Sequence, residues 1–300
     1  MFSAERDWLA RQAAFYYLDE LVAEYGQALP WEPLRDGFDF EGERVTLVGV
    51  RGIWKPQCLD LPISIRTSPA NPYGDATGTD GLLRYKYFQD NPNHPDNVGL
   101  RECFRRGIPL IYFEGLERGW YAPLWPLILV ADNPADLNVV AACDDLNDLR
   151  PGGAPGADGD ARRRYVTRLA IVRLHQARCR QEVLRAYARS CSVCRLGHLE
   201  LLDAAHIIAD HTEEGGDPVV PNGLALCKIH HAAFDANLLG IRPDYVVEVR
   251  PAVLREADGP MLRHGLQAIH HQPIHIPHRP GDRPDADRLE IRYDEFREAG

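Results

Sequence analysis

The chain has 300 residues, of which 45% are hydrophobic and 26% are charged, and its formal net charge is −10 at neutral pH. These proportions are typical of a soluble globular protein with enough apolar residues for one large domain or two ordinary ones. No apolar run approaches the roughly 18 residues of a membrane helix, and the amino terminus lacks the apolar core of a signal peptide. We therefore expect a cytoplasmic protein with no membrane span.

The first part of the chain, residues 1–143, is predicted to be a mostly β domain that opens with a helix. Apolar residues recur at helical spacing between Ala4 and Tyr25. From Arg44 onward the apolar runs are short and are separated by Gly, Pro, Asn and Asp, with one short helix near 98–105. The runs expected to form strands are VTLVGV, ISIRT, LLRYKYF, PLIYFEG and LWPLILVA. So many short strands favour a strongly twisted sheet or barrel.

The second part of the chain is predicted to be a separate domain, which makes the fold class α+β. Residues 144–160, DDLNDLRPGGAPGADGD, are rich in Gly, Pro and Asp and predict a flexible linker. The domain that follows, 161–300, begins with the strongest helical pattern of the chain, which continues to Ala188. Strand-like residues 199–208 and a short helix over 228–237 come next.

Arginines are concentrated at the start of this second domain. Residues 161–195 contain ten arginines and a single acid, Glu182. A local basic stripe can bind phosphate groups even on an acidic chain, because the whole-chain charge mainly sets solubility. The alternative is a solvated helix face. The arginines expected to contact a DNA backbone are Arg162, Arg163, Arg164 and Arg173.

Cysteine usage indicates a metal site and not disulfides. Three of the seven cysteines combine with a histidine in a CxxC and CxxH pattern, which is the spacing of a closed tetrahedral zinc site. The other four cysteines lack paired spacing, which is typical of a reduced, cytoplasmic protein. The expected ligands of a structural Zn²⁺ are Cys191, Cys194, Cys227 and His230.

A second pattern, His206, Asn222 and His231, occupies the same segment and is not needed by a structural zinc. Hydrolysis of a phosphodiester requires a group that activates water and a cation that neutralises charge on the phosphate and the leaving oxygen. His206 ends an apolar strand and suits a general base, because imidazole can accept a proton near neutral pH. Asn222 can hydrogen-bond this base or its loop and so fix the orientation of the ring.

His231 is the candidate ligand of a catalytic divalent cation, which we expect to be Mg²⁺, Mn²⁺ or Co²⁺. Adjacent residues of a helix diverge by roughly 100°, so His230 and His231 are assigned to different ions. Asp235 lies one turn after His231 and can bind the same cation or pair with an arginine. Asp203 is a further candidate, although in a regular strand it falls on the opposite face from His206.

The segment resembles the HNH endonucleases of the McrA-like restriction type. The resemblance rests on CxxC, AAHI, NGLALC and HH followed by FD, and it extends from about Tyr165 to near Arg292. It implies a ββα-metal fold with a structural zinc, a single catalytic divalent ion and DNA cleavage. Many members of the wider family place a metal-binding Asp or His directly before the general base, whereas this chain has Ala205 there.

Residues 44–131 resemble, more loosely, the SRA (YDG) domain, a PUA-like twisted β-barrel that reads modified cytosine. The resemblance rests on NPYGDATGTDGLLRYKYF, LRECFRRGIPLIYFEG and GWYAPLWPLILV. Such domains extrude 5-methyl- or 5-hydroxymethylcytosine from the duplex and stack two aromatic rings on it. Tyr73 and Tyr85 match these aromatics, and Tyr87 lies on the strand face of Tyr85. The acid that follows the first aromatic is displaced in this chain: Asp75 is present, and Ala76 stands where the acid is expected. The alternative is that these tyrosines are ordinary strand residues.

Together the two resemblances imply a modification-dependent, type IV-like restriction endonuclease that defends against modified phage or foreign DNA. Its partner would be double-stranded DNA with modified cytosine, and a homodimer is expected because a double-strand break usually needs two active sites. One alternative is an HNH nuclease that reads another mark, such as phosphorothioate. Others are a non-catalytic reader of modified DNA, and a damage or toxin nuclease that ignores modification.

Overall fold

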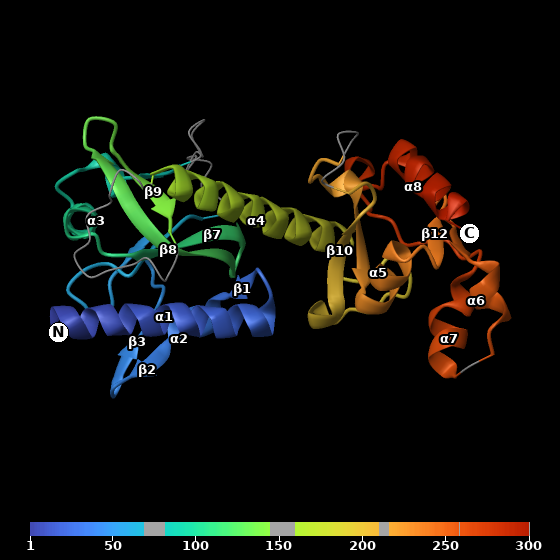
Figure 1. The fold of residues 1–300 in the computed structure, drawn as a ribbon, viewed down its shortest axis with the longest axis horizontal. Coiled ribbons are helices and arrows are strands. Elements are labelled where there is room, and N and C mark those ends of the chain that lie inside the picture. The colour runs from blue at the N-terminus through green and yellow to red at the C-terminus, as the bar shows by residue number, and fades with distance from the viewer. Residues whose placement is uncertain (69–81, 145–159, 210–215, 258, 300) are drawn as a thin grey trace. The chain divides into compact units, whose positions relative to one another are not determined.

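The protein consists of two compact units, Met1–Ala177 and Arg178–Gly300, which we call the amino-terminal and carboxy-terminal units. The boundary lies inside a helix, α4 (Asp160–Ala186), whereas the predicted linker precedes that helix. Among the described residues, no helix is long and apolar enough to cross a membrane. A computed structural model, drawn in Figure 1, describes residues 1–68, 82–144, 160–209, 216–257 and 259–299.

The amino-terminal unit is built on one curled sheet. Its strands follow the order β4-β5-β7-β8-β9-β6, and β1 adds to β8. The long strand β8 is irregularly paired with both β7 and β9, and such bulges bend a strand and increase its twist. Among the described residues the edge strands β4 and β6 are not paired with each other. The described strands therefore form a twisted, curled sheet, one of the two forms that the short strands predict. The strands are β1 (Leu29–Pro30), β4 (Ile53–Trp54), β5 (Ser64–Arg66), β6 (Leu83–Lys86), β7 (Leu110–Glu117), β8 (Trp120–Asn133) and β9 (Asn138–Cys143), with a separate hairpin of β2 (Phe38–Phe40) and β3 (Glu43–Val45).

Helices cover both faces of this sheet, because its central strands are apolar on both sides. Along β7, Ile111 and Phe113 belong to the core that packs against α1, whereas Leu110 and Tyr112 belong to the opposite core. That second core also takes in residues of α3 and the first part of α4. The helices of the unit are α1 (Ala4–Tyr25), α2 (Trp31–Asp36) and α3 (Pro95–Arg106), with a 3-10 turn η1 (Phe88–Asp90).

The carboxy-terminal unit has a ββα layout at its centre. Strands β10 and β11 form an antiparallel hairpin, and α5 follows β11 directly. The last turn of α4 supplies Val183 and Leu184, and the residue just after the helix supplies Tyr187, to the core of this unit. The elements are η4 (Leu199–Leu201), β10 (Leu202–His206), η5 (Val220–Asn222), β11 (Gly223–Cys227), α5 (Lys228–Asp235), β12 (Leu239–Ile241), β13 (Val247–Val249), α6 (Pro251–Arg255), α7 (Pro260–Gly265), η6 (Gln267–Ile269), η7 (Pro280–Asp282) and α8 (Ala286–Glu298).

Helix α8 anchors the end of α5. The buried guanidinium of Arg292 donates a hydrogen bond of 2.6 Å to the carbonyl of Phe234 and lies 4.5 Å from the centre of its ring. The last carbonyls of a helix have no partner within the helix, so this contact satisfies one of them. Arg292 thereby fixes the carboxyl end of α5, the helix that carries His230 and His231. The amino end of α5 directly follows Cys227, a candidate zinc ligand.

Candidate metal centre and nuclease site

Three thiols and an imidazole gather where α4, the β10–β11 hairpin and α5 meet. One donor atom from each of the four residues lies within 4.8 Å of the others. The sulfurs of Cys194 and Cys227 are 3.9 Å apart, and Nδ1 of His230 lies 3.2 Å from the sulfur of Cys227 and 3.5 Å from that of Cys191. Bonds of about 2.3 Å to sulfur and 2.0 Å to nitrogen place tetrahedral zinc ligands roughly 3.3–3.8 Å apart. The four residues therefore fit a Zn²⁺ ion.

The rest of the His230 ring supports the same assignment. Its Nε2 lies 2.7 Å from the carbonyl oxygen of Gly265, at the end of α7, and can donate a proton to it. This leaves Nδ1 free of its proton and directed at the three sulfurs, which is the usual arrangement of a zinc-binding histidine. Hydrogen bonds from Cys191 and Cys194 also lower the pKa of the Cys227 thiol, and the thiolate is the form that binds metal.

His206 lies at the end of β10, half-buried, and its backbone pairs with Gly223 at the start of β11. The hairpin register is regular from Leu202 to His206. This pairing brings the predicted base next to Asn222, the residue that precedes β11. The structure thus brings together two of the three residues predicted for catalysis.

Asn222 is fully buried and closes the turn after His206. Its Oδ1 accepts a hydrogen bond of 2.9 Å from the amide of Ile208, and its Nδ2 donates to the carbonyls of Ile208 (2.9 Å) and Asp217 (3.1 Å). Its own carbonyl accepts from the amide of Ile207 at 2.9 Å. Asn222 therefore holds the loop that follows His206, which is one of the two contacts that the sequence allows for it.

Replacement of Asn222 by alanine should lower the free energy of unfolding of the carboxy-terminal unit by about 1–3 kcal/mol, because buried backbone groups lose their partners. Urea denaturation followed by circular dichroism measures this change, and cleavage should fall with it. Asn93→Ala, at an exposed asparagine of the amino-terminal unit, is the control. Equal stability of the two variants would show that the Asn222 bonds contribute nothing.

His231, on α5, lies near two carboxylates, Asp203 of β10 and Asp235 of α5. Its Nδ1 lies 3.8 Å from Oδ2 of Asp203, and its Nε2 lies 3.3 Å from Oδ2 of Asp235. Ligand atoms of one small cation lie roughly 3 Å apart, so a carboxylate and one nitrogen of His231 can share an ion. The other carboxylate then lies where it can accept the second N–H and orient the ring.

Asp203 lies on the face of β10 opposite that of His206, as the strand period predicts. This face of β10 meets His231. In the regular register of β10, Asp203 and Ala205 are alternate residues and share a face. Position 205 is where many members of the family that the sequence resembles have a metal-binding Asp or His. Asp203 thus offers a carboxylate on the appropriate face, two residues earlier in the strand.

The four arginines predicted to contact DNA differ in their surroundings. Arg162 and Arg163 both donate hydrogen bonds to the buried carboxylate of Asp144, at 2.6 and 2.8 Å. Arg164 and Arg173 are exposed on α4. Two of the four guanidinium groups therefore already balance an acid of the amino-terminal unit.

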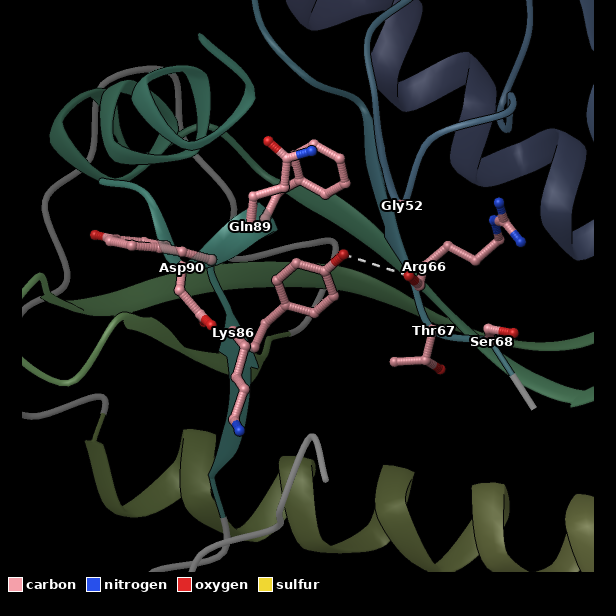
Figure 2. Close-up of a pocket in the computed structure, with 10 residues that line it drawn as sticks. Gly52, Arg66, Thr67, Ser68, Lys86, Gln89 and Asp90 are labelled. Carbon is pink, nitrogen blue, oxygen red and sulfur yellow. Dashed lines mark hydrogen bonds between the residues drawn. The ribbon is translucent and has the colours of Figure 1, made fainter. Parts of the chain in front are cut away.

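The amino-terminal unit has a pocket of about 470 Å³ beside β6, shown in Figure 2. The buried side chains of Tyr85 and Tyr87 line it. The hydroxyl of Tyr85 donates to the carbonyl of Arg66 at 3.3 Å, the dashed bond of the figure. The hydroxyl of Tyr87 hydrogen-bonds to Asp132, and burial together with this carboxylate raises the pKa of Tyr87.

The other residues of the pocket come from just before β4, from the end of β5 and the residues after it, from β6 and from η1: Gly52, Arg66, Thr67, Ser68, Lys86, Phe88, Gln89 and Asp90. Tyr73 and Asp75, also predicted for the base pocket, lie outside the described residues. Two further residues of these sites are not predicted from the sequence: Asp132, which hydrogen-bonds to Tyr87, and Arg180, which hydrogen-bonds to Asp203. Both contacts join segments far apart in the chain, and no local spacing signals them.

Comparison with known protein families gives a match that lies in the carboxy-terminal unit. Residues 191–242 match the family model for HNH endonucleases. The modification-dependent TagI restriction endonuclease shares 17% sequence identity with a TM-score of 0.32, over 78% of this chain and 81% of that one. The type IV phosphorothioation-dependent restriction endonuclease ScoMcrA shares 16% identity with a TM-score of 0.21, over 70% and 56%. A search of curated proteins found no match. The family match begins at Cys191 and spans all three catalytic candidates: the chain carries an HNH endonuclease domain and is an endonuclease.

Proposed function

We propose that this protein is a modification-dependent restriction endonuclease that acts as a homodimer on double-stranded DNA. In this proposal the amino-terminal unit is SRA-like and binds 5-methyl- or 5-hydroxymethylcytosine, and the HNH domain hydrolyses a nearby phosphodiester bond. The observation that carries the nuclease part is the arrangement of His206, Asn222 and His231 on one ββα unit beside a Cys₃His cluster. The reading of a modified base is supported by the tyrosine-lined pocket beside β6.

In the nuclease site each residue has a proposed task. His206 accepts the proton of the attacking water, and Asn222 holds the loop that carries it. His231, with Asp203 or Asp235, would hold the divalent cation, which when bound supplies charge neutralisation at the phosphate and the leaving oxygen. The Cys₃His zinc fixes the start of α5 and takes no part in the chemistry.

In the proposed reading step a modified cytosine leaves the duplex and enters the pocket beside β6. A volume of about 470 Å³ is within the usual range of small-molecule sites. Tyr85 forms part of the wall, and its ring is held by the bond from its hydroxyl to Arg66. Tyr73 is proposed as the second stacking ring, with Asp75 near the base edge. Arg164 and Arg173, exposed on α4, are proposed to contact phosphates.

A cleavage assay on matched plasmids tests the proposal. The plasmids carry cytosine, 5-methylcytosine, 5-hydroxymethylcytosine or phosphorothioate, and each is incubated with the protein and Mg²⁺, Mn²⁺ or Co²⁺. We expect cutting only of the plasmids with modified cytosine. Equal cutting of all four would contradict selective reading, cutting of the phosphorothioate plasmid alone would assign a different mark, and no cutting of any would leave a non-catalytic reader.

Replacement of Tyr73 by alanine should abolish the preference for modified DNA while leaving basal cleavage intact. Loss of one base–aromatic stack costs roughly 1–3 kcal/mol, which corresponds to a roughly 5- to 150-fold loss of preference. The ratio of cleavage rates on methylated and unmethylated plasmid measures it. Tyr16→Ala, at an exposed tyrosine of α1, is the control. An unchanged ratio for Tyr73→Ala would place the base pocket elsewhere.

A further inference from the structure

Arg180, in the last turns of α4, contacts the strand that leads to the nuclease site. Its Nε donates a hydrogen bond of 2.9 Å to Oδ1 of Asp203, and its Nη2 donates one of 2.7 Å to the carbonyl of Leu202. One guanidinium therefore holds both a carboxylate and the backbone next to it. Two divergent donors in a rigid plane fix an orientation that a single ion pair would leave free.

The two oxygens of Asp203 have different surroundings. Oδ1 accepts from Arg180 and also from the amide of Ala204, at 2.9 Å each. Oδ2 is the oxygen that lies 3.8 Å from Nδ1 of His231. With both donors on one oxygen, the other is directed at the histidine predicted to bind the catalytic cation.

We propose that Arg180 is a positioning residue of the nuclease site, which holds Asp203 so that its Oδ2 and His231 bind the catalytic cation together. This inference rests on the proposed function, which assigns a divalent cation to His231. It also explains how the site works with Ala205 in the position before the base: Asp203 shares the strand face of Ala205, and Arg180 fixes its direction. Arg180 touches neither substrate nor cation and acts through Asp203.

Stability alone does not account for this arrangement. The side chains of Arg180 and Asp203 are 29% and 34% exposed, and ion pairs with such access to water contribute at most about 1 kcal/mol. A variant without the guanidinium should therefore fold. Partners that hold a metal-ligating group are instead worth about 10- to 100-fold in metal affinity.

The test is Mn²⁺ binding to the full, zinc-containing protein without DNA, followed by the electron paramagnetic resonance signal of free Mn²⁺. Asp203→Asn should weaken binding strongly, and Arg180→Gln should weaken it about 10- to 100-fold. The double variant should bind no more weakly than Asp203→Asn, because Arg180 acts only through that carboxylate. Arg180→Lys should restore part of the affinity, since it keeps a charge and loses the second, fixed donor.

Arg242→Gln is the matched control, because it removes an exposed arginine of the same unit that pairs with Asp244 at 2.7 Å. It should leave Mn²⁺ affinity unchanged. If Asp203→Asn left it unchanged, Asp203 would not be a cation ligand and the role of Arg180 would fail, while His231 with Asp235 would remain. If His231→Ala left it unchanged as well, the cation assignment of the proposed function would fail. If Asp203→Asn weakened binding and Arg180→Gln did not, the role of Arg180 would fail alone. Additive losses of Mn²⁺ affinity in the double variant would also contradict the role of Arg180.

Discussion

Replacement of His206 by alanine should abolish cleavage and leave DNA binding and folding intact. The fold tolerates the change because the pairing of β10 with β11 uses the backbone of His206, and Asn222 holds the following turn through the backbone of Ile208. The chemistry does not tolerate it, because general base catalysis contributes about 10²- to 10⁴-fold to such reactions. Single-turnover cleavage with excess enzyme measures the loss, since it reports the chemical step without product release.

Removal of an imidazole that has no proposed role should not cause this loss. His198→Ala is the matched control, since His198 is exposed and belongs to the same unit. Fluorescence anisotropy with labelled duplex should give equal affinities for the two variants and the unaltered protein. Cleavage by His206→Ala at the rate of the control would remove His206 from the mechanism. A loss of binding that matched the loss of cleavage would make it a DNA contact and not a base.

Helices were the most predictable part of the fold, because their apolar periodicity is local. The sequence predicts the opening helix at its observed bounds, Ala4–Tyr25, and a short helix near 98–105 where α3 (Pro95–Arg106) lies. The long arginine-rich helix is found as α4 (Asp160–Ala186). These helices bury one stripe of side chains each, and such a stripe is visible in the sequence alone.

Strands were less predictable, because a short apolar run gives no sign of whether it finds a partner strand. The run VTLVGV was expected to be a strand, but only Val45 belongs to one, β3. Leu47, Val48 and Gly49 are buried in irregular backbone. Leu47 hydrogen-bonds to Leu34 and Ser64, and Gly49 lies against the ring of Trp54, where a side chain would not fit. Conversely β9 (Asn138–Cys143) was missed, although it joins β8 to β6.

The zinc ligands and the catalytic trio were predicted as sets, because each is defined by spacing within one short segment. What the spacing could not give is which carboxylate meets His231. The strand periodicity correctly separates Asp203 from His206, yet only the packing of α5 shows that His231 lies on the side of Asp203. Arg292, which fixes the end of α5, comes from a helix that the sequence did not predict, α8.

Replacement of Cys191 by serine should unfold the carboxy-terminal unit and spare the amino-terminal one. Structural zinc contributes about 10–16 kcal/mol of apparent binding free energy in small zinc modules, more than the stability of a typical domain. The cluster also joins the end of α4 to β11 and α5, so its loss removes the contacts that hold the hairpin. The two units have separate apolar cores, which should let one unfold without the other. Hydrogen exchange should show lost protection in β10, β11 and α5, and retained protection in β7 and β8.

The matched control is Cys179→Ala, which removes a buried cysteine of the same core that is not a ligand. Burial raises the pKa of Cys179 to about 11, so this residue is a thiol and packs as a small apolar side chain. The control should retain one zinc per chain, the protection of β10 and cleavage, whereas Cys191→Ser should lose all three. Elemental analysis gives the zinc content. If Cys191→Ser kept its hydrogen-exchange protection without zinc, the apolar core alone would hold the HNH domain, and the cluster would have no structural role.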